Sequence, residues 1–315
     1  MKTIVAVVTS GLGNRLMGLM SCIHIAEREN AEVLIVWPEF QDCNIHISKL
    51  FDIKGQLISI LDEKTAKDIK VGPLYRMAGA NTKIDISQKA IIPGFPELNN
   101  KIESIKYFEG TSEEPLITRK IINENNIFLW PFHFIATEYC TRQDMAKGVQ
   151  SIFWRLMPSR EVLRRVEEFE KENSHVKEYL SLHVRRPYFH RKTPEQELIH
   201  SADLISDEDY LKIAELIINK YEKNLFLCSN DPEIEKKAQE RFGNSILLFN
   251  KNSTMNNNPL AIIDALAEMI IISRSIHAFA SSSFSTFGMN IGDNPLGYTW
   301  IGTANDFAKA TTELE

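Results

Sequence analysis

The sequence has few cysteines, no excess of basic residues and no long apolar run. The four cysteines are Cys22, Cys43, Cys140 and Cys228. They lie far apart and form no CxxC pair, so neither a zinc site nor a disulfide framework is indicated. No stretch reaches the roughly 18 uninterrupted apolar residues of a membrane helix, and the formal net charge of −6 argues against a nucleic-acid-binding face. We expect a cytoplasmic protein with reduced thiols, no transmembrane segment and no nucleic-acid partner.

The first part of the chain begins with the pattern of a β-α-β unit. Ile4–Val8 is apolar, glycines follow at once, and apolar residues then recur at helical spacing from Leu16 to Ala26. Val33–Trp37 is a second apolar run, which predicts a strand parallel to the first. From residue 40 to residue 134 the pattern weakens, and we assign no elements there.

The second part of the chain alternates regularly between apolar strands and helices. Pro158 separates two helical patterns, and we place a domain boundary there, between residues 1–157 and residues 158–315. The strands expected after it are Tyr179–Val184, Leu225–Cys228, Ser245–Phe249, Ile276–Ala280 and Tyr298–Ile301. The expected helices are Asp207–Tyr221, one that begins at Pro232, one from Pro259 to Ser273, and Phe284–Ile291. This alternation predicts an α/β fold with two Rossmann-like domains.

The turn after the first expected strand contains the sequence GLGNRL. Gly11 and Gly13 allow the backbone to turn close to a ligand, and the helix that follows offers amide donors at its positive end. A nicotinamide dinucleotide site would need a third glycine where Leu16 stands and an acidic residue at the end of the next strand. Because the nearest acid, Glu39, lies beyond Pro38, an oxidoreductase is disfavoured. Glycines that serve only the turn are the other explanation.

Two adjacent arginines follow the expected strand Tyr179–Val184. Arginine presents a planar fork of donors that suits phosphate oxygens. At the carboxyl end of a strand, Arg185 and Arg186 can therefore reach one diphosphate. A pair of solvated arginines on a loop is the alternative explanation.

Two further strand ends carry polar residues where a helix is expected to begin. SNDPEIEK starts at Ser229, and its Asp231 is explained as a helix cap before Pro232, although such a position also contacts ligands in open sheets. ASSSFSTFG, Ala280–Gly288, places four serine hydroxyls and that of Thr286 at a strand-to-helix turn, where hydroxyls and amides can bind phosphate without a metal. Together with the arginine pair, these turns predict a diphosphate site.

The four motifs resemble, in order and approximate spacing, those of the superfamily of α-1,2- and α-1,6-fucosyltransferases and protein O-fucosyltransferases. HVRR at His183–Arg186 is similar to its HxRxxD-type motif, and GLGNRL is similar to its GLGNQ or GLGNR opening. SNDPEIEK resembles its SDD- or TDDP-like second motif, and SSSFSTFG resembles its STFSWWG- or TFSSQ-like third. The resemblance spans nearly the whole chain but finds no match over residues 40–130.

The resemblance implies an inverting glycosyltransferase of the GT-B architecture, in which two Rossmann-like domains face each other across a cleft. Residues 1–157 would bind most of the acceptor, and residues 158–315 would bind GDP-fucose as the donor. The superfamily needs no cofactor and no metal. We therefore expect transfer of fucose to a hydroxyl of a glycan, such as a surface polysaccharide or a lipid-linked precursor.

The resemblance also implies roles for individual residues. Arg185 matches the arginine of the motif and would be the catalytic residue that neutralises charge developing on the β-phosphate. Donor-binding residues would be Asn14, Arg15, His183, Arg186, Asp231, Ser282, Ser283 and Ser285, with Gly11 and Gly13 in the loop. For His183, a core position satisfied by the backbone is the other explanation.

The sequence departs from the motif at its acidic position, where Tyr188 stands. The role of that acid is therefore open, and so is the base that takes the proton of the acceptor hydroxyl. Glu195 and Glu197 are the carboxylates that follow the arginines, and we take Glu195 as the candidate. Two alternatives remain: another nucleotide sugar as donor, because phosphate-binding motifs do not identify the base or the sugar, and a catalytically silent protein that binds a nucleotide or a sugar.

Overall fold

The computed structural model describes residues 3–8, 11–39, 43–54, 57–61, 63, 126–129, 134, 140–186, 205–255 and 257–315. The chain divides into two compact units. Unit 1 comprises Met1–Ser159 with Met255–Ile263, and unit 2 comprises Arg160–Thr254 with Asp264–Glu315. Each unit contains one parallel sheet.

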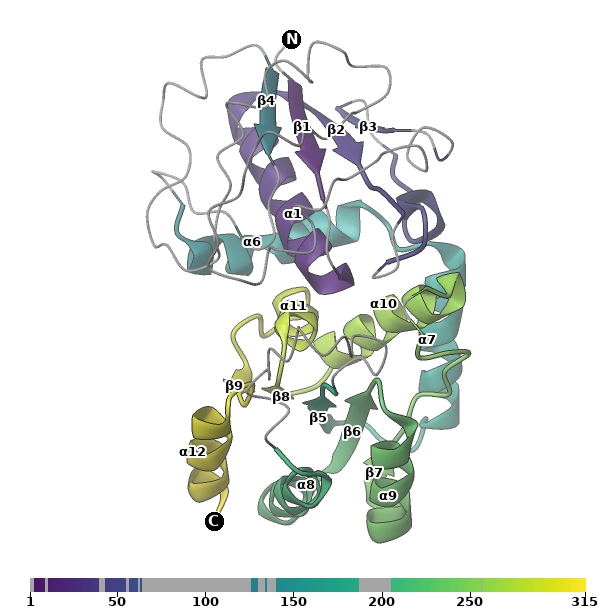
Figure 1. Ribbon diagram of the computed structural model, residues 1–315, viewed down its shortest axis with the longest axis vertical. Helices are drawn as coiled ribbons and strands as arrows, with labels where there is room; N and C mark the ends of the chain where they lie inside the picture. The colour runs from purple at the N-terminus through teal and green to yellow at the C-terminus, as the bar shows by residue number, and fades with distance from the viewer. Residues whose placement is uncertain are drawn as a thin grey trace, which may run out of the picture. The chain divides into compact units, whose positions relative to one another are not determined.

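Unit 1 is built on a four-stranded sheet in the order β3-β2-β1-β4 (Figure 1). Its strands, all parallel, are β1 Thr3–Val7, β2 Glu32–Val36, β3 Ile58–Ile60 and β4 Asn126–Leu129. The helix α1, Leu12–Glu29, joins β1 to β2, and α6, Arg142–Arg155, packs against α1. A short 3-10 helix, Ile47–Lys49, follows β2. The β-α-β unit expected at the start of the chain is therefore present.

Unit 2 is built on a five-stranded parallel sheet in the order β7-β6-β5-β8-β9. Its strands are β5 Tyr179–Val184, β6 Asn224–Ser229, β7 Ile246–Leu247, β8 Ala278–Ala280 and β9 Tyr298–Trp300. The accompanying helices are α7 Arg160–Glu172, α8 Asp207–Tyr221, α9 Pro232–Phe242, the 3-10 helix Gly243–Ser245, α10 Pro259–Ser273, α11 Ser283–Asn290 and α12 Ala304–Leu314. Helix α10 belongs to unit 2 from Asp264 onward, and its start belongs to unit 1. The strand order reverses at β5, which is the order of a Rossmann-like half.

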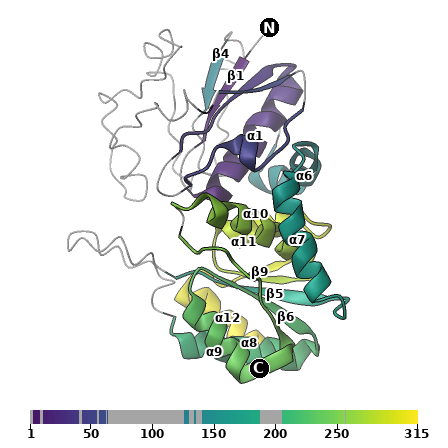
Figure 2. The same ribbon diagram turned by 90° about the vertical axis from the view of Figure 1, so that its right-hand side faces the viewer.

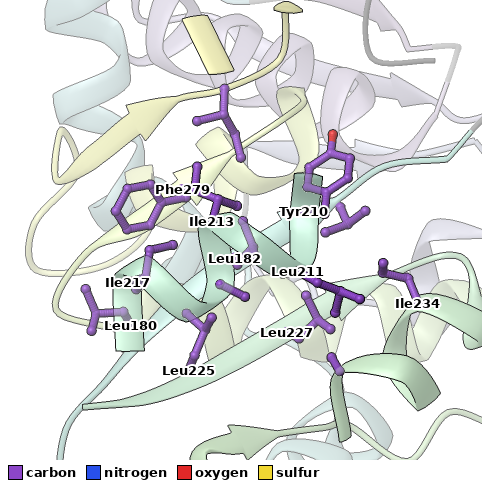
Figure 3. Close-up of a cluster of buried hydrophobic side chains, with 14 of the residues drawn as sticks. Leu180, Leu182, Tyr210, Leu211, Ile213, Ile217, Leu225, Leu227, Ile234 and Phe279 are labelled. Atoms are coloured by element: carbon purple, nitrogen blue, oxygen red, sulfur yellow. The ribbon is translucent and has the colours of Figure 1, made fainter. Parts of the chain in front are cut away.

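One face of the unit 2 sheet packs on α8, α9 and α12 (Figure 2). Leu180 and Leu182 of β5 point to this face, together with Leu225 of β6 and Ile213 of α8 (Figure 3). All four side chains are fully buried. Because side chains alternate along a strand, this burial fixes which residues of β5 point to the opposite face, and His183 is one of them.

The opposite face of the unit 2 sheet packs on α7 and α10 (Figure 2). Phe226 of β6 and Phe169 of α7 lie edge to face, with ring centroids 5.2 Å apart. The hydroxyl of Tyr179 on β5 donates to the carbonyl oxygen of Ile271 on α10 over 2.7 Å. A sheet covered on both faces explains why its strands are nearly continuous apolar runs.

The predicted α/β fold with parallel sheets is confirmed. Helices α8 and α10 have the expected limits. Each begins where expected because Ser206 or Asn258 accepts a hydrogen bond from an amide of the first turn. Helix α12 is absent from the predicted elements, although Phe307, Ala310 and Leu314 recur at helical spacing and are buried.

Truncation of a leucine in this core tests the packing. We expect Leu182→Ala to lower the free energy of unfolding by about 2–5 kcal/mol, since the side chain is fully buried and leaves a cavity. Leu296→Ala is the control, because Leu296 is 39% exposed and its truncation should cost less than about 0.5 kcal/mol. Urea denaturation measures both. Equal losses in the two variants would contradict the placement of Leu182.

Candidate functional site

Three of the predicted motifs lie together at one edge of the unit 2 sheet. Strands β5 and β8 are neighbours, and the strand order reverses there. Ligands of open parallel sheets bind outside the carboxyl ends of the strands at such a reversal. Arg185 follows β5, Ser281 follows β8 and Asn230 follows β6. The folding of unit 2 therefore brings these sequences to the position where a ligand is expected.

His183 joins β5 to the turn between β8 and α11. Its Nδ1 lies 2.9 Å from the hydroxyl oxygen of Ser281, 3.1 Å from that of Ser285 and 3.5 Å from that of Ser282. The imidazole ring stacks on Phe284, with centroids 5.2 Å apart and an interplanar angle of 23°. The partners of Nδ1 are thus serine hydroxyls, whereas the sequence suggested backbone groups.

The surroundings of His183 keep its imidazole neutral. Burial, together with the positive charges of Arg185 and Lys251, lowers the pKa of His183 to about 3. A neutral Nδ1 without a proton accepts one hydrogen bond, and the hydroxyl of Ser281 is the nearest donor. The hydroxyl of Ser285 has an alternative acceptor, since it lies 3.1 Å from the carbonyl oxygen of Ser282.

Arg185 is the first residue beyond β5, and it is exposed. Its amide N–H donates to the hydroxyl of Ser281 over 3.3 Å. The backbone of Arg185 is therefore fixed at the carboxyl end of β5. A cation at this edge, next to the amino terminus of α11, is suited to a phosphate group.

Arg186 differs from its neighbour, because it is buried and its side chain is bonded within unit 2. Its guanidinium donates to the carbonyl oxygen of Ile205 over 2.7 Å and to the carboxylate of Asp207. The same group lies over the ring of Tyr210, 4.9 Å from its centroid. These contacts indicate a structural role, and a donor-binding role for Arg186 stays a prediction.

Asn230 and Asp231 follow β6 and serve different purposes. Asp231 caps α9 by accepting the amide N–H of Glu233 over 3.0 Å, as the sequence suggested. The side chain of Asn230 accepts the N–H of Arg186 over 2.8 Å and donates to its carbonyl oxygen over 3.0 Å. Asn230 was not among the residues predicted for the site, although a polar residue directly after a strand at this edge is the signal that identifies it.

The three serines predicted to bind the donor lie at the start of α11. The hydroxyl of Ser282 caps the helix by accepting the amide N–H of Phe284 over 3.2 Å. Ser282 and Ser285 are buried, whereas Ser283 is half-buried. Any contact of the two buried hydroxyls with a donor stays a prediction, because the hydroxyl of Ser282 already accepts the amides of the first turn.

The fourth motif lies in unit 1, after β1. Gly11 is the residue before α1, with an extended φ of −70°, and a Cβ built on it would meet no atom within 4 Å. Gly13 and Asn14 lie in the first turn of α1. Arg15 is fully buried: its guanidinium donates to the carbonyl oxygen of Pro38 over 2.7 Å and lies over the ring of Trp37. These contacts give Arg15 a structural role, and donor binding by Asn14 or Arg15 stays a prediction.

The candidate base Glu195 lies outside the described residues, as do Glu197 and Tyr188. In the part of the chain that the structure describes, no group of three or more histidine, cysteine, aspartate or glutamate side chains could hold a metal ion. Within the same residues, no helix combines the length and apolar character needed to cross a membrane.

The fold is similar to that of solved fucosyltransferases. The fucosyltransferase NodZ from Bradyrhizobium aligns over 92% of this chain and 93% of its own, with a TM-score of 0.55 and 14% identity. NodZ α-1,6-fucosyltransferase soaked with GDP-fucose aligns over 92% of each chain, with a TM-score of 0.55 and 17% identity. POFUT1 in complex with GDP aligns over 96% of this chain and 98% of its own, with a TM-score of 0.53 and 13% identity.

No protein-family model matches the sequence, and no curated protein matches it. At these identities the structural likeness establishes the fold, which is the GT-B fold of fucosyltransferases. The resemblance inferred from the four motifs is therefore confirmed at the level of the fold.

The protonation of His183 provides a test of the site. The imidazole gains its proton near pH 6.5 in the unfolded chain but only near pH 3 in the folded one, so stability linked to His183 is complete above pH 6.5 and is lost as the pH falls toward 3. We expect a neutral ring protonated on Nε2 at pH 5.5. Imidazole nitrogen NMR spectra, with the resonance assigned by its absence from His183→Gln, measure this. A doubly protonated ring at pH 5.5 would contradict the hydrogen bonds to Nδ1.

Proposed function

We propose that this protein transfers fucose from GDP-fucose to a hydroxyl of a glycan, with inversion at the sugar carbon and without a metal. The observation that carries the proposal is Arg185, an exposed arginine at the reversal of the strand order, whose N–H bonds to Ser281 in the turn before α11. The fold supports it, since structures of this fold were determined with GDP-fucose and with GDP.

The proposed reaction breaks the bond between the anomeric carbon of fucose and an oxygen of the β-phosphate. Negative charge develops on that oxygen as the bond lengthens. The guanidinium of Arg185 and the amides at the start of α11 stabilise the charge, which lowers the barrier without a divalent ion. The acceptor oxygen attacks the opposite face of the sugar carbon, which inverts its configuration, and its proton passes to a base for which Glu195 is the sequence candidate.

Unit 2 is the proposed donor-binding domain, because the strand-order reversal and three of the motifs belong to it. Unit 1 is correspondingly the proposed acceptor-binding domain. A guanine nucleotide is favoured by the structures of this fold, and the diphosphate features of unit 2 are shared by other nucleotide sugars.

Nucleotide binding tests the identity of the donor. Binding to the native state raises the melting temperature by mass action, so GDP and GDP-fucose should raise it, whereas UDP and NAD should leave it unchanged. Differential scanning fluorimetry at equal nucleotide concentrations measures the shifts. A selective shift with UDP would replace the proposed donor with another nucleotide sugar. A protein that responds to no nucleotide would contradict the proposal as a whole.

Removal of the exposed cation tests its role in the reaction. Arg185→Ala should lower turnover about a hundredfold or more, because the charge on the leaving diphosphate loses its counter-charge. Arg241→Ala is the matched control: Arg241 lies on α9 of the same unit and pairs with Glu208 and Glu215. Transfer from labelled GDP-fucose to a screened acceptor measures both. Wild-type turnover in Arg185→Ala would remove Arg185 from the mechanism.

A chelator tests the metal-free scheme. We expect turnover in excess EDTA to equal turnover in buffer, because fixed cations and amides carry the neutralisation of the diphosphate. The measurement is the initial rate of transfer with EDTA, and with EDTA followed by magnesium. Strong inhibition that magnesium reverses would refute the scheme and assign the neutralisation to a divalent ion.

A further inference from the structure

We propose that Asn230 and Ser281 are positioning residues, which act by fixing the backbone of Arg185 from both sides. The inference rests on the proposed function, because it assumes that Arg185 meets a nucleoside diphosphate. Neither residue belongs to the donor-binding set expected from the motifs. Ser281 bonds to the main chain of Arg185, and Asn230 bonds to the main chain of Arg186, the next residue.

Asn230 extends the sheet by one step. The parallel ladder between β5 and β6 ends at the pair Val184 and Ser229. Beyond it, the side-chain amide of Asn230 bonds to both main-chain groups of Arg186. Its oxygen accepts the N–H of Arg186 over 2.8 Å, and its nitrogen donates to the carbonyl oxygen of Arg186 over 3.0 Å. These two hydrogen bonds take the place of the main-chain bonds that the next residue pair of the ladder would make. They hold the segment that leaves β5 in line with the strand, where an unpaired backbone would be free to rotate.

Ser281 fixes the same segment from the other neighbouring strand. Its hydroxyl oxygen accepts the N–H of Arg185 over 3.3 Å, and its proton points to Nδ1 of His183 over 2.9 Å. One hydroxyl can serve both contacts, since it has one donor and two acceptor sites. The neutral state of His183 is what makes Nδ1 an acceptor. The end of β5 is thereby bonded to the turn before α11.

The two contacts bracket Arg185 in the sequence. Ser281 holds its own N–H, and Asn230 holds the residue that follows, whose guanidinium is already bound by Ile205 and Asp207. The direction in which the Arg185 side chain leaves the sheet edge is therefore set before any ligand arrives. A preset cation contributes more to charge stabilisation than one that must first be ordered, because the ordering costs conformational entropy.

A double-mutant cycle on GDP affinity separates positioning from stability. Asn230→Ala should weaken GDP binding about tenfold. In an Arg185→Ala background the same substitution should change the affinity less than about twofold, because its effect is exerted through Arg185. Isothermal titration calorimetry on the full chain measures the four dissociation constants. A tenfold loss in both backgrounds, or no loss in either, would overturn the inference.

Matched variants complete the test. Asn224→Ala removes the side-chain bond from Asn224 to the carbonyl oxygen of Asn244 at the opposite end of β6, so it should leave GDP affinity unchanged. Ser281→Ala should repeat the loss seen with Asn230→Ala, and Ser281→Thr should restore affinity because it keeps the hydroxyl. If Asn230→Ala fails to fold, Asn230→Ser, which retains one hydrogen bond, should give a smaller loss that also disappears without Arg185.

The outcomes distinguish the two proposals. A wild-type protein that binds no nucleoside diphosphate contradicts the proposed function and this inference together. A wild-type protein that binds GDP through Arg185, with additive effects of Asn230→Ala or no rescue by Ser281→Thr, contradicts the positioning roles alone.

Discussion

The hydrogen bond between Ser281 and His183 is the interaction on which the site depends. It joins the carboxyl ends of β5 and β8, the two strands between which the order of the unit 2 sheet reverses. Burial of alternate leucines on β5 turns His183 toward the opposite face, where its ring stacks on Phe284 of α11. Burial of the ring itself keeps it neutral and able to accept a hydrogen bond. The apolar core thus determines a polar contact at the edge of the sheet.

The paired arginines show how neighbouring residues of one type acquire different roles. The side chain of Arg186 lies on the α8 face of the sheet. There its guanidinium donates to Ile205 and Asp207 and lies over the ring of Tyr210. Arg185 stays at the edge and is exposed. A buried cation is stable only with partners of this kind, since an unpaired charge away from water costs several kcal/mol. The contacts of Arg186 therefore hold the segment after β5 in place, whereas Arg185 is the arginine proposed to meet an anion.

Much of the fold was predictable from local patterns, and part of the site was not. The limits of α8 and α10 follow from cap residues and apolar spacing, which are properties of a short stretch of sequence. The contacts of Arg186 with Ile205 and Asp207 span about twenty residues and arise only after folding, so two adjacent arginines gave no sign of their difference. The bonds that Asn230 and Ser281 make to the main chain after β5 could not be predicted for the same reason, because they join different strands.

The proposed function requires that the carboxyl ends of β5 and β8 bind a nucleoside diphosphate through Arg185. A crystal structure of the protein with GDP is the decisive measurement. We expect a diphosphate in contact with the guanidinium of Arg185 and with the first turn of α11. A diphosphate bound at another edge, without contact to Arg185, would contradict it.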